Sequence, residues 1–200
     1  MSSVDLKRIY KDHYTANAKP ALVVVPPRPY LMVPGRGDPN TSQEYADAIA
    51  TIYPVAYGLR KAVKEASNIA YTVMPLEGLW WVDDLASLSF EDKTNWNWIA
   101  MICQPDEVTA EMADSVIPRV TADKNLAAGD IARLETFGDG LAVQILHVGP
   151  DSDEQPTIAR LHHHIETEGF QFRGRHHEIY LSDARNSPPA KLHTILCQPV

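Results

Sequence analysis

The feature that most limits how this chain can fold is an internal repeat. It reads Ile102-Cys103-Gln104-Pro105 in the first copy and Leu196-Cys197-Gln198-Pro199 in the second, each time after an apolar run. The only two cysteines of the chain occupy the same place in both copies. Repeats dictate architecture, so we expect two related halves. The seam between two such halves is a common place for a small-molecule site.

Both copies predict the same order of elements: strand, helix, strand, strand. We place repeat one at residues 21–105, a connecting amphipathic helix at 106–125 and repeat two at 130–200. Together they form a single domain, residues 21–200, behind an N-terminal extension of residues 1–20. Short helices between paired strands are typical of an α+β fold. We predict one antiparallel sheet with the helices on one face and a ligand groove on the other.

Prolines lead to two local predictions in repeat one. The apolar runs Ala21–Val25 and Tyr30–Val33 are separated by prolines, which favours one edge strand with a break. The following helix contains Pro54, which should kink or split it near Tyr53, because proline lacks the amide hydrogen of a helical turn.

Composition excludes several classes of function. The net charge of −8 argues against a direct nucleic-acid partner, because phosphate binding needs clustered cations. No run of about 18 apolar residues predicts a membrane span, and the charged N-terminus does not resemble a signal peptide. We therefore expect a cytoplasmic protein. The histidine and cysteine spacings match no metal motif, so we expect neither a metal nor another cofactor, and a free sheet edge would allow a homodimer.

Strand alternation singles out Glu178 as a candidate catalytic residue. In the predicted strand 176–181, Glu178 shares one face with His176 and Tyr180. The alternate residues, His177 and Ile179 among them, form the more apolar face, which we expect to meet the helices. Glu178 would then point into the groove. A carboxylate on a central strand is costly unless it is solvated or paired.

Two other interpretations of the carboxylates remain open. Glu178 can instead form a salt bridge to Arg173 or Arg175, or simply be exposed. Glu77 is a second catalytic candidate, because it lies in an apolar context beside two tryptophans. A mechanism with paired carboxylates would depend on the distance between Glu77 and Glu178.

All four tryptophans lie within residues 80–98, which predicts an aromatic ligand site. Trp96 and Trp98 share a face of a predicted strand, whereas Trp80 and Trp81 point apart if their segment is extended. Such a concentration favours a box for a flat or cationic ligand. Packing in the core is the alternative. The other candidates for ligand contact are aromatic or imidazole side chains: Tyr57, Tyr71 and His176.

Two stretches resemble the GyrI-like small-molecule-binding family, which includes the effector-binding domains of multidrug-sensing transcription activators. One is Arg173–Asp183 with the following Pro188–Leu192, and the other is Tyr71–Trp81. The likeness spans about residues 20–200. The second stretch contains Met-Pro-Leu-Glu-Gly-Leu-Trp-Trp at 74–81. It resembles a stand-alone branch whose members hydrolyse the cyclopropane ring of DNA-alkylating natural products related to yatakemycin.

The resemblance implies a twisted antiparallel sheet with the ligand in a concave groove. It implies that Glu178 matches the strand glutamate with which sensor members meet cationic drugs. In the hydrolytic branch an aromatic cage holds a flat electrophile, and its members map here onto aromatic side chains: Tyr71, Trp80, Trp98 and Tyr180. Glu178 or Glu77 would then activate a water molecule, with Tyr180 or His176 as a donor to the developing negative charge.

Three functions are consistent with these features. The first is a hydrolase that detoxifies cyclopropane-containing DNA-alkylating compounds. The second is a non-catalytic binder that sequesters or senses flat or cationic drugs. The third is an inhibitor of a DNA enzyme, as the founding member of the resembled family is for gyrase. The third leaves the clustered tryptophans unexplained, so we rank it last.

Overall fold

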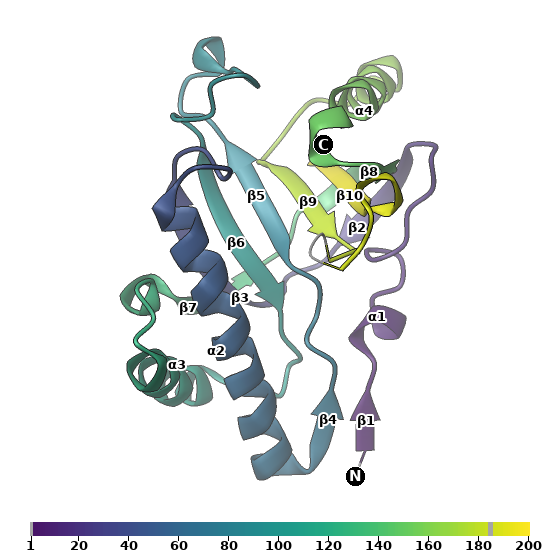
Figure 1. Ribbon diagram of the computed structural model, residues 1–200. Coiled ribbons are helices and arrows are strands. Elements are labelled where there is room, and N and C mark those ends of the chain that lie inside the picture. Colours follow the sequence, from purple (N-terminus) through teal and green to yellow (C-terminus); the bar gives the residue numbers. More distant parts are fainter. Residues whose placement is uncertain (1, 184–185) are drawn as a thin grey trace. The chain divides into compact units, whose positions relative to one another are not determined.

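The computed structural model describes residues 2–183 and 186–200 (Figure 1). Contacts divide the chain into two units. Unit 1 comprises the N-terminal residues up to Leu6, Arg28–Met74 and Gly78–Phe137. Unit 2 comprises Lys7–Pro27, Pro75–Glu77 and Gly138–Val200. Each unit is thus assembled from segments that are far apart in the sequence.

Unit 1 combines two helices with an antiparallel sheet. Its elements are β1 (Ser2–Val4), β3 (Arg28–Arg36), α2 (Gln43–Ser67), β4 (Ile69–Tyr71), β5 (Glu77–Trp81), β6 (Asn97–Cys103), α3 (Ala110–Lys124) and β7 (Arg133–Phe137), with 3-10 turns at Leu85–Ser87 and Gly129–Ile131. The strands follow the order β5-β6-β3-β7. In the register, Leu31 of β3 pairs with Ile102 of β6 and with Leu134 of β7. Strands β1 and β4 form a separate parallel pair.

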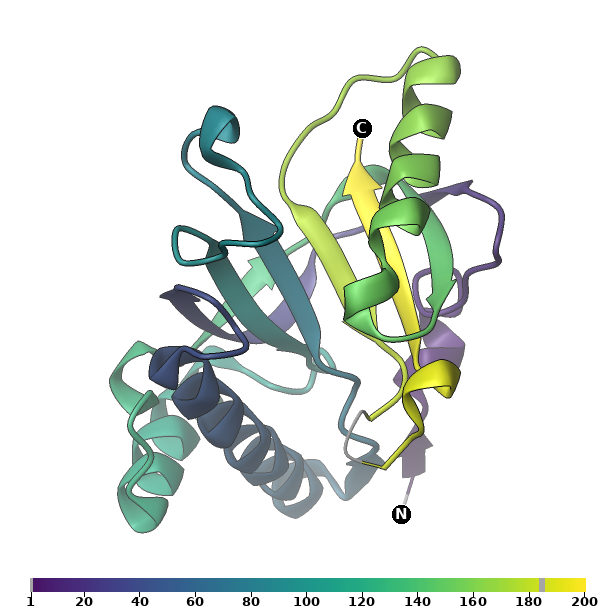
Figure 2. The ribbon, with the colours of Figure 1, turned by 45° about the horizontal axis from the view of Figure 1, so that its top comes forward.

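Helix α2 packs on this sheet and beside α3 (Figures 1 and 2). Ser42 caps its N-terminus by accepting a hydrogen bond from the amide of Tyr45, and Asn68 ends it in a left-handed conformation. Pro54 lies inside the helix, yet α2 is not split near Tyr53 as predicted, because the apolar side chains around the proline are buried. No helix within residues 2–183 and 186–200 has the length and apolar character needed to cross a membrane.

Unit 2 has one long helix and four antiparallel strands. Its elements are α1 (Leu6–Ile9), which begins at the last N-terminal residue of unit 1, β2 (Ala21–Val25), β8 (Gly140–Val148), α4 (Gln155–Thr167), β9 (His176–Tyr180) and β10 (His193–Pro199), with 3-10 turns at Asp151–Asp153 and Pro189–Lys191. The strand order is β2-β8-β10-β9. Helix α4 packs against β8 and β10 (Figure 2).

The predicted repeat is confirmed. Repeat one is β3-α2-β5-β6 and repeat two is β8-α4-β9-β10. In both, the last strand lies between the other two, in the orders β3-β6-β5 and β8-β10-β9. Cys103 and Cys197 are buried at matching places in β6 and β10. The α+β fold class with a tandem strand-helix-strand-strand unit and antiparallel strands is therefore as predicted.

The apolar runs at the start of repeat one are two separate strands. β2 pairs with β8 in unit 2, where Val23 lies opposite Ala142. β3 lies between β6 and β7 in unit 1, where it is central. β2 is an edge strand as predicted, but the two runs are separate strands rather than one broken strand, and β3 is not at an edge. The prolines between the runs mark the place where the chain leaves unit 2 and enters unit 1.

The two faces of β9 have different neighbours. Glu178 pairs directly with Leu196 of β10, so the two side chains lie on the same face. Leu196 belongs to a core cluster with residues of β8 and α4: Val143, Ile145, Leu161 and Ile165. Helix α4 thus covers the face that carries Glu178. The prediction that the face with His177 and Ile179 meets the helix is wrong, because alternation separates the faces without telling which one the helix takes.

Candidate functional site

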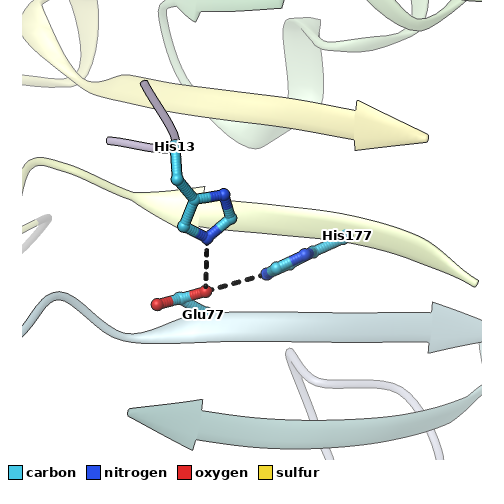
Figure 3. Close-up of side chains that lie close together, drawn as sticks. All are labelled: His13, Glu77 and His177. Carbon is cyan, nitrogen blue, oxygen red and sulfur yellow. Dashed lines mark hydrogen bonds and ion pairs between the residues drawn. The ribbon is translucent and has the colours of Figure 1, made fainter. Parts of the chain in front are cut away.

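Five buried side chains of unit 2 form a polar cluster, which we call the Glu77 cluster. Figure 3 shows three of them, His13, Glu77 and His177. The hydroxyl of Tyr14 donates to Oε1 of Glu77 at 2.5 Å. The other carboxylate oxygen, Oε2, lies 2.9 Å from Nε2 of His177 and 3.4 Å from Nε2 of His13. On the opposite side of the His177 ring, Nδ1 lies 2.6 Å from Oδ2 of Asp139. The cluster thus runs from one carboxylate through an imidazole to another.

Four separate segments of unit 2 supply this cluster. His13 and Tyr14 follow α1, in a segment that Gln144 of β8 holds in place. The side-chain amide of Gln144 donates to the carbonyl oxygen of Asp12 at 2.7 Å and to that of Thr15 at 3.0 Å. The other three members begin β5, precede β8 and lie within β9. The residues predicted to form an N-terminal extension therefore contribute two members of a buried network.

The cluster has strongly perturbed electrostatics. Burial alone would raise the pKa of Glu77, but hydrogen bonds and charge from His13 and His177 lower it to about 2. Burial alone would lower the pKa of His177, but the adjacent Asp139 and Glu77 raise it to about 10. Burial and the same two carboxylates raise the pKa of the Cys197 thiol well above its ordinary value. Glu77 is thus ionised and enclosed, and this geometry favours a structural role over the catalytic one predicted for it.

Glu178 has a more open environment. Its side chain is 12% exposed, and Oε2 accepts a hydrogen bond from the Tyr180 hydroxyl at 2.6 Å. Nε2 of His176 lies 3.3 Å from Oε1. The structure therefore brings together three of the predicted site residues on one face of β9. Arg173, the predicted alternative partner, instead donates to backbone carbonyl oxygens such as those of Asp139 and Val200.

Five rings of unit 1 form an aromatic cluster. Tyr45 of α2 lies 5.0 Å from Trp98 and 5.8 Å from Trp80, as ring-centroid distances. Trp80 lies 6.0 Å from Trp96, and Trp96 lies 5.8 Å from Phe90. Trp80 and Trp98 are buried, whereas Trp96 is partly exposed. The structure thus brings three of the predicted ligand contacts together and selects Trp80, rather than Trp81, as the tryptophan of β5 in this cluster.

Two indole nitrogens of the aromatic cluster are unusual. Nε1 of Trp80 and Nε1 of Trp98 are buried and have no hydrogen-bond partner among the described residues. Nε1 of Trp96, in contrast, donates to the carbonyl oxygen of Ser89 at 2.9 Å. Leaving a buried donor unsatisfied typically costs about 1–3 kcal/mol. Such groups in a native protein call for an explanation.

Two other predicted ligand contacts have different surroundings. The hydroxyl of Tyr71 donates to Oε1 of Gln104 at 3.1 Å, and burial raises the pKa of Tyr71 well above its usual range. Its backbone carbonyl accepts a hydrogen bond from Arg60 at 2.6 Å. Tyr57 lies on α2 with 57% of its surface exposed. Tyr71 is thus engaged in the core of unit 1 and Tyr57 faces solvent.

Sequence reasoning missed several residues of these clusters. His13 and Tyr14 stand in the predicted N-terminal extension, Asp139 precedes the predicted first strand of repeat two, and no motif marks them. Tyr45 carried a usable signal, since it opens the apolar face of the predicted helix. His177 was placed correctly on the face opposite Glu178, but its partners were invisible because they are remote in the sequence.

Comparison with known proteins assigns the family. The GyrI-like small molecule binding domain matches residues 18–200, so the chain belongs to the GyrI-like family. An uncharacterized conserved protein from Listeria innocua is 36% identical, with a TM-score of 0.90 and 98% of each chain covered. Two structures of hydrolases from Listeria innocua are each 34% identical, with TM-scores of 0.84 and 0.87 and coverage of 98% and 99% of both chains. No curated protein matched the chain.

Proposed function

We propose that this protein hydrolyses the cyclopropane ring of yatakemycin-type DNA-alkylating compounds, with Glu178 as the general base. The observation that carries the proposal is the environment of Glu178, which is partly exposed and fixed by Tyr180 and His176. The similar hydrolases from Listeria innocua support hydrolysis as the class of reaction. Detoxification is the corresponding role in the cell.

The reaction needs few catalytic groups. A cyclopropane fused to a dienone is a strained electrophile, and its opening yields an aromatic phenol. The oxygen of water forms a bond to a cyclopropane carbon while a carbon–carbon bond of the ring breaks. The electron pair of that bond moves to the dienone oxygen, which becomes a phenolate and takes up a proton. Glu178 accepts the proton of the attacking water, a contribution typically worth 10²–10⁴-fold.

The neighbours of Glu178 have distinct parts in this mechanism. The Tyr180 hydroxyl fixes the orientation of the carboxylate by donating to Oε2. Nε2 of His176 lies 3.3 Å from Oε1, on the other side of the carboxylate. Either neighbour is also a suitable donor to the phenolate oxygen. Both side chains lie beside Glu178 on the same strand, so a donor to the phenolate oxygen and the base would act close together.

The aromatic cluster supports a flat ligand that carries hydrogen-bond acceptors. Its two unsatisfied indole nitrogens, on Trp80 and Trp98, are donors suited to carbonyl groups. Phe90 is exposed, and Trp96 and Tyr45 are partly exposed, so these three rings offer surface for stacking. We infer that these residues contribute to ligand affinity rather than to the chemical step.

A non-catalytic binder is the second candidate, favoured by the family's small-molecule-binding character. Mass spectrometry of a yatakemycin-type cyclopropane incubated with the full chain separates the two functions. A product heavier by one water, formed with multiple turnovers, supports hydrolysis. Release of unchanged ligand after denaturation, together with quenched tryptophan fluorescence, supports binding alone. Absence of both effects contradicts both functions for this class of compound.

A further inference from the structure

The Glu77 cluster has the donor atoms of a metal site. Nε2 of His13, Nε2 of His177 and a carboxylate oxygen of Glu77 all lie within 4.8 Å of one another. The two imidazoles approach the same oxygen, Oε2, at 3.4 and 2.9 Å (Figure 3). In a tetrahedral zinc site with bonds of about 2.0–2.1 Å, ligand atoms lie about 3.3 Å apart. Small shifts of the side chains would therefore place all three around one ion.

The surroundings of these atoms match the second shell of a metal site. Metal-binding histidines usually donate their other ring nitrogen to a carboxylate, which fixes the tautomer. Asp139 provides such a partner, with Oδ2 2.6 Å from Nδ1 of His177. The other carboxylate oxygen of Glu77, Oε1, accepts a hydrogen bond from the Tyr14 hydroxyl.

The charges of the cluster favour a divalent cation. Glu77 and Asp139 bring two negative charges into a region closed to solvent, with side chains at most 2% exposed. Within residues 2–183 and 186–200, no lysine or arginine forms an ion pair with either carboxylate. Burying charge is expensive unless it is balanced. Without an ion, the His177 ring lies between the two carboxylates and offsets part of their charge. When both imidazoles are neutral, as metal ligands must be, one doubly charged ion would balance both carboxylates.

We propose that His13, Glu77 and His177 bind one divalent transition-metal ion of the zinc class, with Asp139 and Tyr14 as supporting partners. Two imidazoles and a carboxylate suit such an ion. The ligand residues come from positions 64 and 100 apart in the sequence, so no motif announces the site. Because its ligands are buried, the site is structural. It ties the segment after α1 to β5 and β9, and the ion enters as the chain folds.

Metal content tests this proposal without reference to any enzymatic activity. The full chain, without a polyhistidine tag, is unfolded in a chelator, refolded with Co²⁺ or Zn²⁺ and freed of unbound ion. We expect one ion per chain by elemental analysis and the absorption spectrum of tetrahedral Co²⁺. We also expect a higher melting temperature than after refolding with chelator, because an ion that binds only the folded state stabilises it. A wild-type chain that retains no ion and melts at the same temperature overturns the proposal.

Variants locate the ion. His13→Gln removes one ligand and should abolish stoichiometric binding, whereas His163→Gln, at an exposed histidine of α4, should retain it. Asp139→Asn should weaken affinity by about 10–100-fold, as expected for a supporting partner. The wild-type measurement decides the matter even where a variant fails to fold. Stoichiometric binding that persists in a folded His13→Gln protein places the ion elsewhere and overturns the assignment.

Discussion

Glu77 and Glu178 are the same residue type in the same unit, yet their environments give them different tasks. Glu77 is enclosed with His13, His177 and Tyr14, and its contacts hold distant segments together. Glu178 keeps part of its surface exposed and contacts Tyr180 and His176 of the same strand, β9. The comparison teaches that a carboxylate in an apolar sequence context is not thereby catalytic. Access to solvent and ligand decides between the two roles.

The largest effect on stability is expected for Glu77→Ala. It removes the shared partner of His13, His177 and Tyr14, and breaking a buried charge pair typically costs about 3–5 kcal/mol. Urea denaturation measures the change. Glu168→Ala, at an exposed glutamate after α4, is the control and should change stability by less than about 0.5 kcal/mol. Equal stabilities of the two variants would contradict a structural role for Glu77.

The pH dependence of stability should report the same enclosed network in chelator-treated protein. The lowered pKa of Glu77, about 2, means that its stabilisation is present above about 4.5 and is lost as the pH falls toward 2. The raised pKa of His177, about 10, means that its stabilisation is complete below 6.5 and is lost as the pH rises toward 10. These two groups therefore place the pH of maximum stability between about 4.5 and 6.5. A urea midpoint that stays constant from pH 6.5 to pH 10 would contradict the stabilisation assigned to His177.

The two tyrosines that donate to the glutamates form a matched pair. Tyr14→Phe removes the hydrogen bond to buried Glu77 and should cost about 1.5–3 kcal/mol of stability, as expected for a bond to a charged group. Turnover per folded molecule should stay unchanged. Urea denaturation and active-site titration measure the two quantities. Reduced turnover with unchanged stability would reverse the roles assigned to the glutamates.

Tyr180→Phe should show the complementary pattern with a smaller effect on the fold. Loss of the hydrogen bond to Glu178 should lower turnover about 10-fold, equivalent to about 1.4 kcal/mol, through misorientation of the base. Stability should change by less than about 1 kcal/mol, because Glu178 remains partly solvated. Initial rates with a cyclopropane substrate provide the measurement. Unchanged rates would remove Tyr180 from the mechanism.

The repeat was the most predictable part of the molecule, because the order of helices and strands along the chain follows from local sequence patterns. Cys103 and Cys197 mark equivalent strands, and alternation placed His177 and Glu178 on opposite faces of β9. The side of α4 was predicted wrongly, because His177 was grouped with apolar Ile179 although its partners are polar. Pro54 does not split α2, which continues from Gln43 to Ser67, whereas a kink at this proline stays a prediction.

The Glu77 cluster was beyond the reach of sequence patterns. Its contacts join residues 64, 100 and 38 positions apart, and each depends on how strands and loops come together. Glu77 itself was noticed because of its apolar context. That context signals burial as readily as catalysis, and only the positions of His13 and His177 separate the two.

Turnover by Glu178→Gln protein tests the central claim most directly. The substitution keeps the size of the side chain and removes its basicity. With a yatakemycin-type cyclopropane, the account predicts a 10²–10⁴-fold lower rate of water addition than wild type, with ligand affinity and the urea midpoint nearly unchanged. Glu168→Gln should behave like wild type. An equal rate for Glu178→Gln and wild type would contradict the assignment of Glu178 as the base.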